Sequence, residues 1–251
     1  MGTRNKKTET FESHIMPHGT IEQVIPDRLW RVTGTLNFPF PREMDIYKLP
    51  GTQSLLLYSV IALNEDQMQA LEALGTPAIL YAPNQFHMID LGVYANRYPQ
   101  AKVICPEGCK AIIEEGVKVD TTIEEEIAKN GQDYPFTTME VKCMRYPFTI
   151  LFADAGAGNG AVIVFLNDLL WNITKIENKG IISSVLAWAL GMEGPLHMTR
   201  YGRWFVLQDK KEFAEVLRKV AEKKIKALMV CHGDPITEDC EERLRQVADT
   251  F

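Results

Sequence analysis

The sequence predicts an α/β protein built as a four-layer αββα sandwich, in which two mixed β-sheets pack face to face between outer helices. The chain runs from a β-rich stretch into alternating strands and helices, and its second half repeats that order. Its 251 residues are 46% apolar and 24% charged, which is sufficient for a large buried core. Because no Pro-, Gly- or Ser-rich linker separates the halves, we expect a single domain over residues 18–251, preceded by a flexible N-terminal arm over residues 1–17.

The first predicted sheet opens with antiparallel strands. Pro26–Asp27–Arg28 and Pro50–Gly51 are turn signals that separate alternating or apolar runs. These strands are expected over residues 20–25, 29–36, 44–49 and 53–60.

Helices then begin to alternate with strands, which indicates parallel pairing with helices outside the sheet. Asn64 and Gln67 form a capping pattern ahead of a helix that Gly75 ends. We expect strands over residues 77–82 and 101–106, a helical turn or two over 91–98, and helices over 107–116 and 122–129.

The second half begins with strands over residues 137–145, 148–153 and 161–167. The segment DAGAGNG (154–160) lacks the GxxxxGK[ST] pattern and has strands on both sides, so it indicates a hairpin and not a phosphate loop. An apolar helix over 181–191, a short segment over 203–207, a basic helix over 209–226, a strand over 226–231 and a helix over 237–249 complete the chain.

Composition excludes several classes of protein. A net charge of −6 argues against general affinity for nucleic acid. The longest apolar stretch, residues 181–192, is too short to span a bilayer and is expected to be a buried or interface helix, so we expect no membrane partner. Five cysteines without a CxxC pair indicate reduced, mostly buried thiols, and the polar N-terminus lacks a signal-peptide core, so a cytoplasmic location is expected.

Three residues at strand ends carry the candidate chemistry. His87, Asp168 and His232 each end or follow a predicted strand, and the order of elements would bring them to one edge of the sandwich. Two histidines and a carboxylate are typical metal ligands. Structural roles are the alternative: a histidine bonded to a backbone carbonyl, Asp168 as a helix cap, and a strand-to-helix turn over residues 232–235.

The element order and these loop positions resemble the metallo-β-lactamase superfamily over about residues 19–250. The segment QFHMIDLG (85–92) aligns with its His-x-His-x-Asp-His motif, with Gln85, His87, Ile89 and Asp90 at the ligand positions. Asp168 corresponds to the bridging aspartate and His232 to the last histidine. The pattern departs from the family at Gln85 and Ile89, and no histidine occurs in residues 141–152.

The resemblance implies a site for one zinc or iron ion, or none, with His87, Asp90, Asp168 and His232 as ligands. Asp234 would orient the His232 ring. The implied function is a single-metal hydrolase of a small ester, thioester or phosphoester. A non-catalytic protein of the same fold, which binds a ligand or partner without hydrolysis, is the alternative, so whether the chain is an enzyme stays open.

The loop over residues 193–204 is a candidate contact surface. His197, Arg200, Tyr201 and Arg203 could bind an anionic or aromatic part of a small-molecule ligand at the rim of the pocket. Alternatively, this loop packs against its own core or a neighbouring subunit, and the region 181–204 would then form a homo-oligomer interface.

Overall fold

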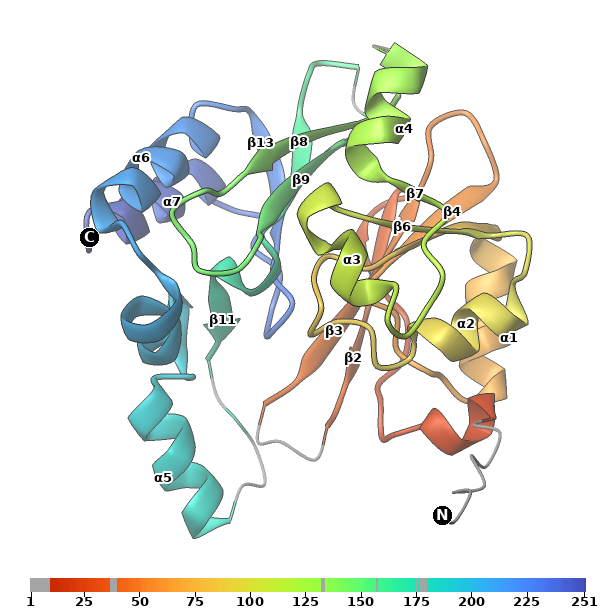
Figure 1. The fold of residues 1–251 in the computed structure, drawn as a ribbon, viewed down its shortest axis with the longest axis horizontal. Coiled ribbons are helices and arrows are strands. Elements are labelled where there is room, and N and C mark those ends of the chain that lie inside the picture. The colour runs from red at the N-terminus through yellow and green to blue at the C-terminus, as the bar shows by residue number, and fades with distance from the viewer. Residues whose placement is uncertain (1–9, 37–39, 132–133, 157, 175, 177–179) are drawn as a thin grey trace.

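Two β-sheets lie face to face at the centre of the molecule, with helices on both outer sides (Figure 1). The computed structural model describes residues 10–36, 40–131, 134–156, 158–174, 176 and 180–251. Within these ranges, the first sheet has seven strands in the order β1 to β7, and the second has four in the order β13-β10-β9-β8. The predicted αββα sandwich is confirmed.

The first sheet is antiparallel at one end and parallel at the other. Strands β1 to β4 pair as successive hairpins, whereas β4, β5, β6 and β7 run parallel. Parallel neighbours need crossover connections, and the helices between them cover the outer face. The strands are β1 (Glu22–Ile25), β2 (Leu29–Gly34), β3 (Arg42–Lys48), β4 (Ser54–Tyr58), β5 (Thr76–Tyr81), β6 (Lys102–Cys105) and β7 (Thr121–Thr122). The helices are α1 (Glu65–Leu74), α2 (Leu91–Arg97), α3 (Lys110–Ile113) and α4 (Ile123–Asn130).

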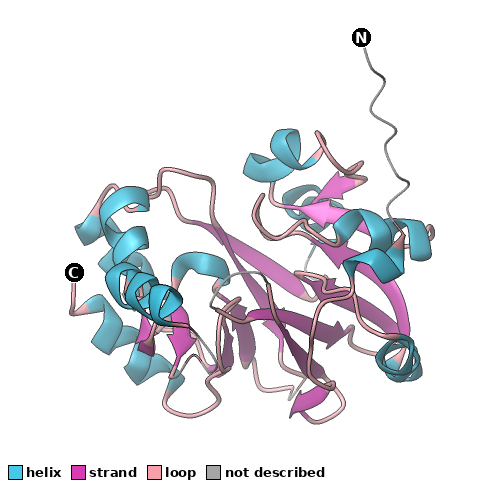
Figure 2. Cartoon of the chain, turned by 90° about the horizontal axis from the view of Figure 1, so that it is seen from below, coloured by secondary structure: helices cyan, strands magenta, loops and turns pink. Residues whose placement is uncertain are grey.

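The second sheet joins an antiparallel meander to one parallel strand. Strands β8 (Phe136–Glu140), β9 (Thr149–Asp154) and β10 (Val162–Phe165) are antiparallel neighbours, and β13 (Ile225–Met229) lies parallel to β10. Between β10 and β13, β11 (Trp171–Ile173) pairs with β12 (Gly194–His197), and α5 (Ile181–Leu190) precedes β12. Helices α6 (Lys210–Val220) and α7 (Cys240–Ala248) cover the outer face (Figure 2).

Three apolar layers hold the two sheets and their covering helices together, and a smaller cluster around Ile173 and Ala187 packs α5. The layer between the sheets contains Leu56 and Tyr58 of the first sheet against Phe136 and Phe165 of the second. One outer layer packs α1, α2 and α3 on the first sheet, and the other packs α6 and α7 on the second. Strands such as β4 and β9 are therefore buried on both faces, which explains why they are apolar runs and not alternating patterns, whereas β1 and β8 expose some of their residues.

Several segments differ from their predicted form. The strand predicted over residues 137–145 ends at Glu140. At the far end of the predicted range, the backbone N–H of Arg145 donates to the carbonyl of Val206 and not to a strand of the sheet. Residues 202–206 form a π-helical turn, η5 (Gly202–Val206). The hairpin between β9 and β10 is confirmed, with Ala157 outside the described residues.

The N-terminal arm was predicted over residues 1–17, of which residues 1–9 lie outside the described part. Residues 10–17 are not a free arm. Phe11 packs its ring 5.2 Å from that of Tyr94 on α2, within a 3-10 turn, Phe11–His14. The physical reason is that Phe11 adds an aromatic side chain to the apolar layer under α1 and α2.

The apolar helix predicted over 181–191 is observed as α5, which stands away from the two sheets at the lower left of Figure 1. Ala187 is buried, whereas Val185, Leu186 and Trp188 are exposed, with Trp188 70% exposed. No described helix is long and apolar enough to cross a membrane.

A buried arginine connects the two sheets. Arg31 on β2 donates to both carboxylate oxygens of Asp45 on β3, at 2.6 and 3.1 Å. Its remaining hydrogens reach the carbonyl oxygens of Gly233 and Val230, each at 2.8 Å, in the loop after β13. A guanidinium has donors enough for all four bonds, so one side chain fixes a loop of the second sheet to the first.

We expect Arg31→Met to lower the free energy of unfolding by ~3–5 kcal/mol, because Asp45 would keep a buried charge without its partner. Urea unfolding followed by circular dichroism measures the change. The double variant Arg31→Met/Asp45→Leu should recover part of the loss. Equal stability of the single variant and the wild type would contradict the role assigned to Arg31.

Glu43, also on β3, is a buried acid with a shifted pKa. Its carboxyl oxygen accepts a hydrogen bond from Thr33 Oγ1 at 2.8 Å. Burial raises the pKa of Glu43 to about 8, and the charge of Arg31 opposes that rise only in part. The native protein therefore binds this proton more tightly than the unfolded chain does.

A raised pKa contributes stability that is complete below the unfolded value near 4.5 and is lost as pH rises towards about 8. We expect the wild type to lose stability across this interval and Glu43→Gln to lose less of it. Urea unfolding at several pH values tests this, with Glu215→Gln, at an exposed position of α6, as the control. Identical pH profiles for the Glu43 variant and the wild type would refute it.

Candidate functional site

The structure brings His87, Asp168 and His232 together. His87 lies in the loop after β5, Asp168 in a 3-10 turn (Asn167–Leu169) after β10, and His232 in the loop after β13. Asp168 Oδ1 is 2.9 Å from His87 Nε2 and 3.1 Å from His232 Nε2. The carboxyl ends of β5, β10 and β13 thus deliver two rings to one carboxylate oxygen.

The partner of its outer ring nitrogen fixes a hydrogen on His232, whereas the serine beside His87 can either donate or accept. His232 Nδ1 is 2.6 Å from the carbonyl oxygen of Pro41, and His87 Nδ1 is 2.7 Å from Ser59 Oγ. Because a carbonyl oxygen only accepts, His232 Nδ1 must carry a hydrogen. In the neutral ring, Nε2 then directs a lone pair at Asp168 Oδ1. Two acceptors this close are stable only with a proton or a metal ion between them.

Asp168 is held in its ionised form. Burial alone would raise the pKa of this carboxyl, but His87 and His232, by charge and hydrogen bond together, hold the pKa of Asp168 well below its ordinary value. The second oxygen, Oδ2, accepts a hydrogen bond from Asn84 Nδ2 at 2.8 Å. The orientation of the carboxylate is therefore set from both sides.

Ser59 and Asn84 are parts of the site that the sequence did not reveal. Asn84 Nδ2 also lies 3.0 Å from Asn167 Oδ1, which links the loop after β5 to the turn after β10. Ser59 and Asn167 both have left-handed backbone, with φ of 57° and 54°. Such strain in non-glycine residues is concentrated at functional sites. The available signal was a polar residue at the end of an apolar strand, as Ser59 is in LLLYSV.

Cys231 lies beneath the site. Donor atoms of His87, Asp168 and Cys231 all fall within 4.8 Å of one another. The thiol is buried, and both burial and the charge of Asp168 raise the pKa of Cys231 well above its ordinary value. It is therefore protonated near neutral pH. All five cysteines are free and buried, as the sequence predicts.

Asp90 is not brought to these three residues. Its Oδ2 accepts from Arg42 Nη2 at 2.5 Å and from the backbone N–H of Ala62 at 3.0 Å, while Oδ1 lies 2.9 Å from His14 Nδ1. Both oxygens are thus engaged at a separate ion pair, which corrects the prediction that Asp90 completes the ligand set. The sequence motif did not show that Arg42, 48 residues away along the chain, lies within bonding distance of Asp90.

Asp234 does not orient His232, contrary to the prediction. Both nitrogens of His232 are occupied, by Pro41 and by Asp168. Asp234 instead donates its backbone N–H to the carbonyl of Asn172, at 2.9 Å, and lies at a separate surface hollow.

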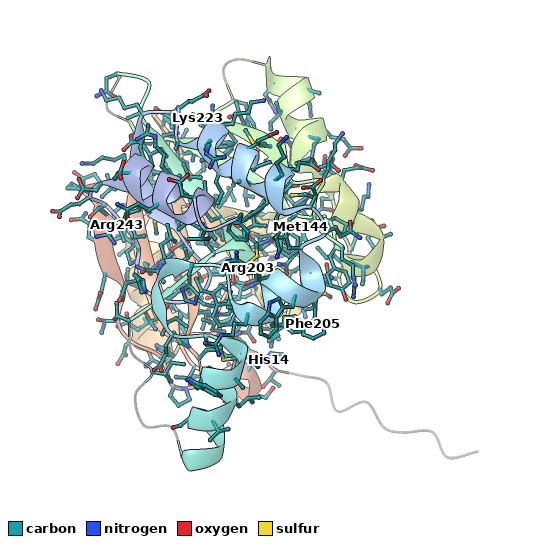
Figure 3. The ribbon with its side chains drawn as sticks, turned by 90° about the vertical axis from the view of Figure 1, so that its left-hand side faces the viewer. His14, Met144, Arg203, Phe205, Lys223 and Arg243 are labelled. Atoms are coloured by element: carbon teal, nitrogen blue, oxygen red, sulfur yellow. The ribbon has the colours of Figure 1, made fainter. Side chains whose placement is uncertain are left out.

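Of the four candidate residues in the predicted contact loop, Tyr201 alone lines the cavity, which the loop also lines with Met198, Thr199 and Gly202. The His197 ring nitrogens bond to the carbonyls of Pro195 and Gly191. Arg200 bonds to the carbonyl of Trp188 and stacks on its ring, and Arg203 bonds to the carbonyl of Thr250 at the C-terminus. Figure 3 views the molecule from this side, with Arg203 labelled. The two arginines therefore serve internal packing, which corrects their predicted role in binding substrate.

The site opens into a cavity of about 360 Å³. Ser59, His87, Asp168 and His232 line it, together with mostly apolar side chains of both halves of the chain. These include Phe40, Val60, Phe148, Trp171, Met198 and Val206. This size and composition are typical of a pocket for a small organic molecule.

The kinds of donor atom at the site fit a metal ion. Two imidazole nitrogens and a carboxylate oxygen are ligands that zinc accepts, and in a tetrahedral zinc site such atoms lie about 3.4 Å apart. The 2.9 and 3.1 Å separations around Asp168 Oδ1 are close to that spacing. Among the described residues, the three whose donor atoms all lie within 4.8 Å of one another are His87, Asp168 and Cys231, and His232 is not in that group. The hydrogen bond from His232 Nδ1 to Pro41 is the kind of outer contact that orients a metal-binding histidine.

Comparison with solved structures shows the metallo-β-lactamase fold. The DIM-1 metallo-β-lactamase exposed to ceftazidime is 10% identical, with a TM-score of 0.55 over 94% of this chain and 99% of that one. The metallo-β-lactamase FIM-1 from Pseudomonas aeruginosa, in its mono-zinc form, is 11% identical, with a TM-score of 0.57 over 94% and 97%. A metallo-β-lactamase from Pontibacter korlensis is 10% identical, with a TM-score of 0.52 over 92% and 99%. At these identities the likeness establishes the fold alone.

Sequence comparisons add nothing to this likeness. No family profile matches the chain, and no curated protein sequence matches it.

Gly233 is the residue that lets the His232 loop approach β11. Its φ is +96°, and a Cβ placed there would overlap the carbonyl oxygen of Asn172. We expect Gly233→Ala to cost ~3 kcal/mol or more of stability, the upper end for strained backbone. Gly158→Ala is the control, because it has a positive φ of 62° and open space around it, so it should cost only ~1–2 kcal/mol. Thermal unfolding compares the two, and equal losses would contradict this account.

Proposed function

We propose that this protein, which has the metallo-β-lactamase fold, is a hydrolase that binds one metal ion, zinc or iron, through His87, Asp168 and His232. Its substrate would be a small ester, thioester or phosphoester. One observation carries the proposal. With His232 Nδ1 donating to Pro41, His232 Nε2 and the charged Asp168 Oδ1 face each other across 3.1 Å, a contact that requires either a proton or a shared metal ion between them.

The surrounding residues support this assignment. Ser59 Oγ accepts from His87 Nδ1 if that nitrogen carries the hydrogen, which leaves His87 Nε2 free as a second donor to metal. Asn84 holds the other oxygen of Asp168, so that Oδ1 remains directed at the two rings. All three candidate ligands would then be oriented before any ion binds, which favours tight binding.

A divalent ion held here would supply a Lewis acid and lower the pKa of a water molecule towards neutrality. The side chains that line the cavity would supply two further requirements of hydrolysis, the exclusion of bulk water and the orientation of the substrate. Buried apolar walls around His87 and His232 exclude bulk water, which strengthens every charge interaction within the cavity. The polar atoms at its inner end would orient the substrate group that reacts.

A second candidate function is binding without hydrolysis. Two of the motif positions expected to supply metal ligands do not supply them, which favours this function. Ile89 projects at the surface with 51% exposure, and Asp90 is paired with Arg42. In that case a proton would replace the metal, and an imidazolium at His232 would pair with Asp168.

Elemental analysis and zinc titration of chelator-treated protein distinguish the two functions. We expect one ion per chain in the wild type and at least a hundredfold weaker binding in His87→Ala and in His232→Ala, because each loses one of three ligands. Asp90→Asn should bind as the wild type does, and His197→Ala is a matched histidine control.

A wild type that neither contains metal nor takes up added zinc, iron or manganese would refute the proposal and favour binding without hydrolysis. Loss of the ion in Asp90→Asn, with retention in His232→Ala, would show a different ligand set.

A further inference from the structure

We infer that the cavity accepts an uncharged carboxylic ester or thioester with an apolar acyl or aryl group. The inference takes the hydrolytic reaction from the proposed function. It narrows the class of substrate by the chemistry of the side chains that line the cavity. The acyl or aryl group would occupy the apolar part, and the carbonyl would lie at the polar inner end.

The exposure of the lining residues distinguishes the inner end of the cavity from its mouth. Ser59 and His232 are buried and mark its inner end. Phe86, Ile89 and Tyr201 are exposed by 55%, 51% and 49% and mark its mouth. A ligand that reaches Asp168 from solvent must therefore pass between apolar or aromatic side chains.

The walls between mouth and inner end are also apolar. Phe148, Met144 and Val206 come from the second half of the chain, and Val60 comes from the first. Met144 is a flexible side chain that adapts to ligands of different shape. These walls offer favourable transfer free energy to methylene or aryl groups and cannot compensate a charge that is moved out of water.

The arginine that lines the cavity is in an ion pair with Asp90, although its Nε has no hydrogen-bond partner. Among the described residues, Arg42 is the only arginine or lysine in the lining, and its Nη2 is bound to Asp90. The charge of Asp168 would repel an anion unless a metal ion neutralised it. The apolar walls cannot compensate the charge of a phosphoester on its way to Asp168, whereas an ester or thioester brings no charge.

Binding of non-hydrolysable methyl ketones with butyl, hexyl and octyl chains tests the inference by calorimetry, in chelator-treated and in zinc-loaded protein. Each two methylenes should tighten binding about tenfold, as expected from burial of apolar surface. The octyl ketone that bears a carboxylate at the far end of its chain should bind at least tenfold more weakly than the uncharged one.

Ile89→Asp places a charge at the mouth and should weaken binding of the octyl ketone about tenfold or more. Ile112→Asp is the matched control, because Ile112 is 45% exposed on α3 and does not line the cavity. Near-ultraviolet circular dichroism of both variants verifies that they fold.

Chain-length dependence that is lost in Ile89→Asp and kept in Ile112→Asp supports the inference, even in a protein that takes up no metal. Affinity that does not rise with chain length, or a similar effect of both substitutions, would overturn the inference and leave the metal proposal standing. Tighter binding of the terminal carboxylate than of the uncharged ketone would also overturn it.

Discussion

The guanidinium of Arg31 is the interaction on which the position of the site depends. It belongs to the first sheet, yet two of its bonds end on carbonyls at Val230 and Gly233, on either side of His232. The loop that carries this histidine leaves β13 and therefore belongs to the second sheet. Pro41, which precedes β3 of the first sheet, accepts the hydrogen bond from the same ring. His232 is thus built on one sheet and positioned by the other, so the geometry around Asp168 requires both layers to be assembled.

The loops around His87, Asp168 and His232 are held rigid, and they include strained backbone conformations that a freely moving loop would not adopt. Ser59 and Asn167 both adopt left-handed backbone, and each holds one partner of the central trio or lies next to it. Strain of this kind persists only where neighbouring contacts over-determine the conformation. Asn84 supplies such contacts, because it bonds to both Asn167 and Asp168. A carboxylate held on both sides and two rings held at their outer nitrogens leave little freedom to rearrange, so binding of a cation would require little reorganisation.

The sequence predicts those features of the structure that a local pattern of residues encodes. Strand-end positions predicted that His87, Asp168 and His232 would meet, because the carboxyl ends of strands share an edge, and the alternation of elements predicted the layers. The direction in which a side chain points was harder to predict than its place in the fold. Asp90 lies three residues from His87 but turns to Arg42, and Arg200 turns to Trp188, because the partners that attract them come from distant segments. Ser59 and Asn84 belong to no recurrent motif. The π-helical turn at 202–206 has more residues per turn than an α-helix, so neither the helix nor the strand pattern predicts it.

The aromatic cage around His232 has an optical consequence. Trp171 lies with its ring centroid 4.1 Å from that of His232, and Phe40 meets the imidazole edge-on at 4.9 Å. The chain has four tryptophans. Trp30 is buried on β2 and Trp188 and Trp204 face solvent, so Trp171 is the one whose emission depends on the charge of an adjacent imidazole. A protonated ring quenches indole fluorescence more strongly than a neutral one. The molecule therefore carries its own spectroscopic reporter of whether a proton or another cation lies between His232 and Asp168.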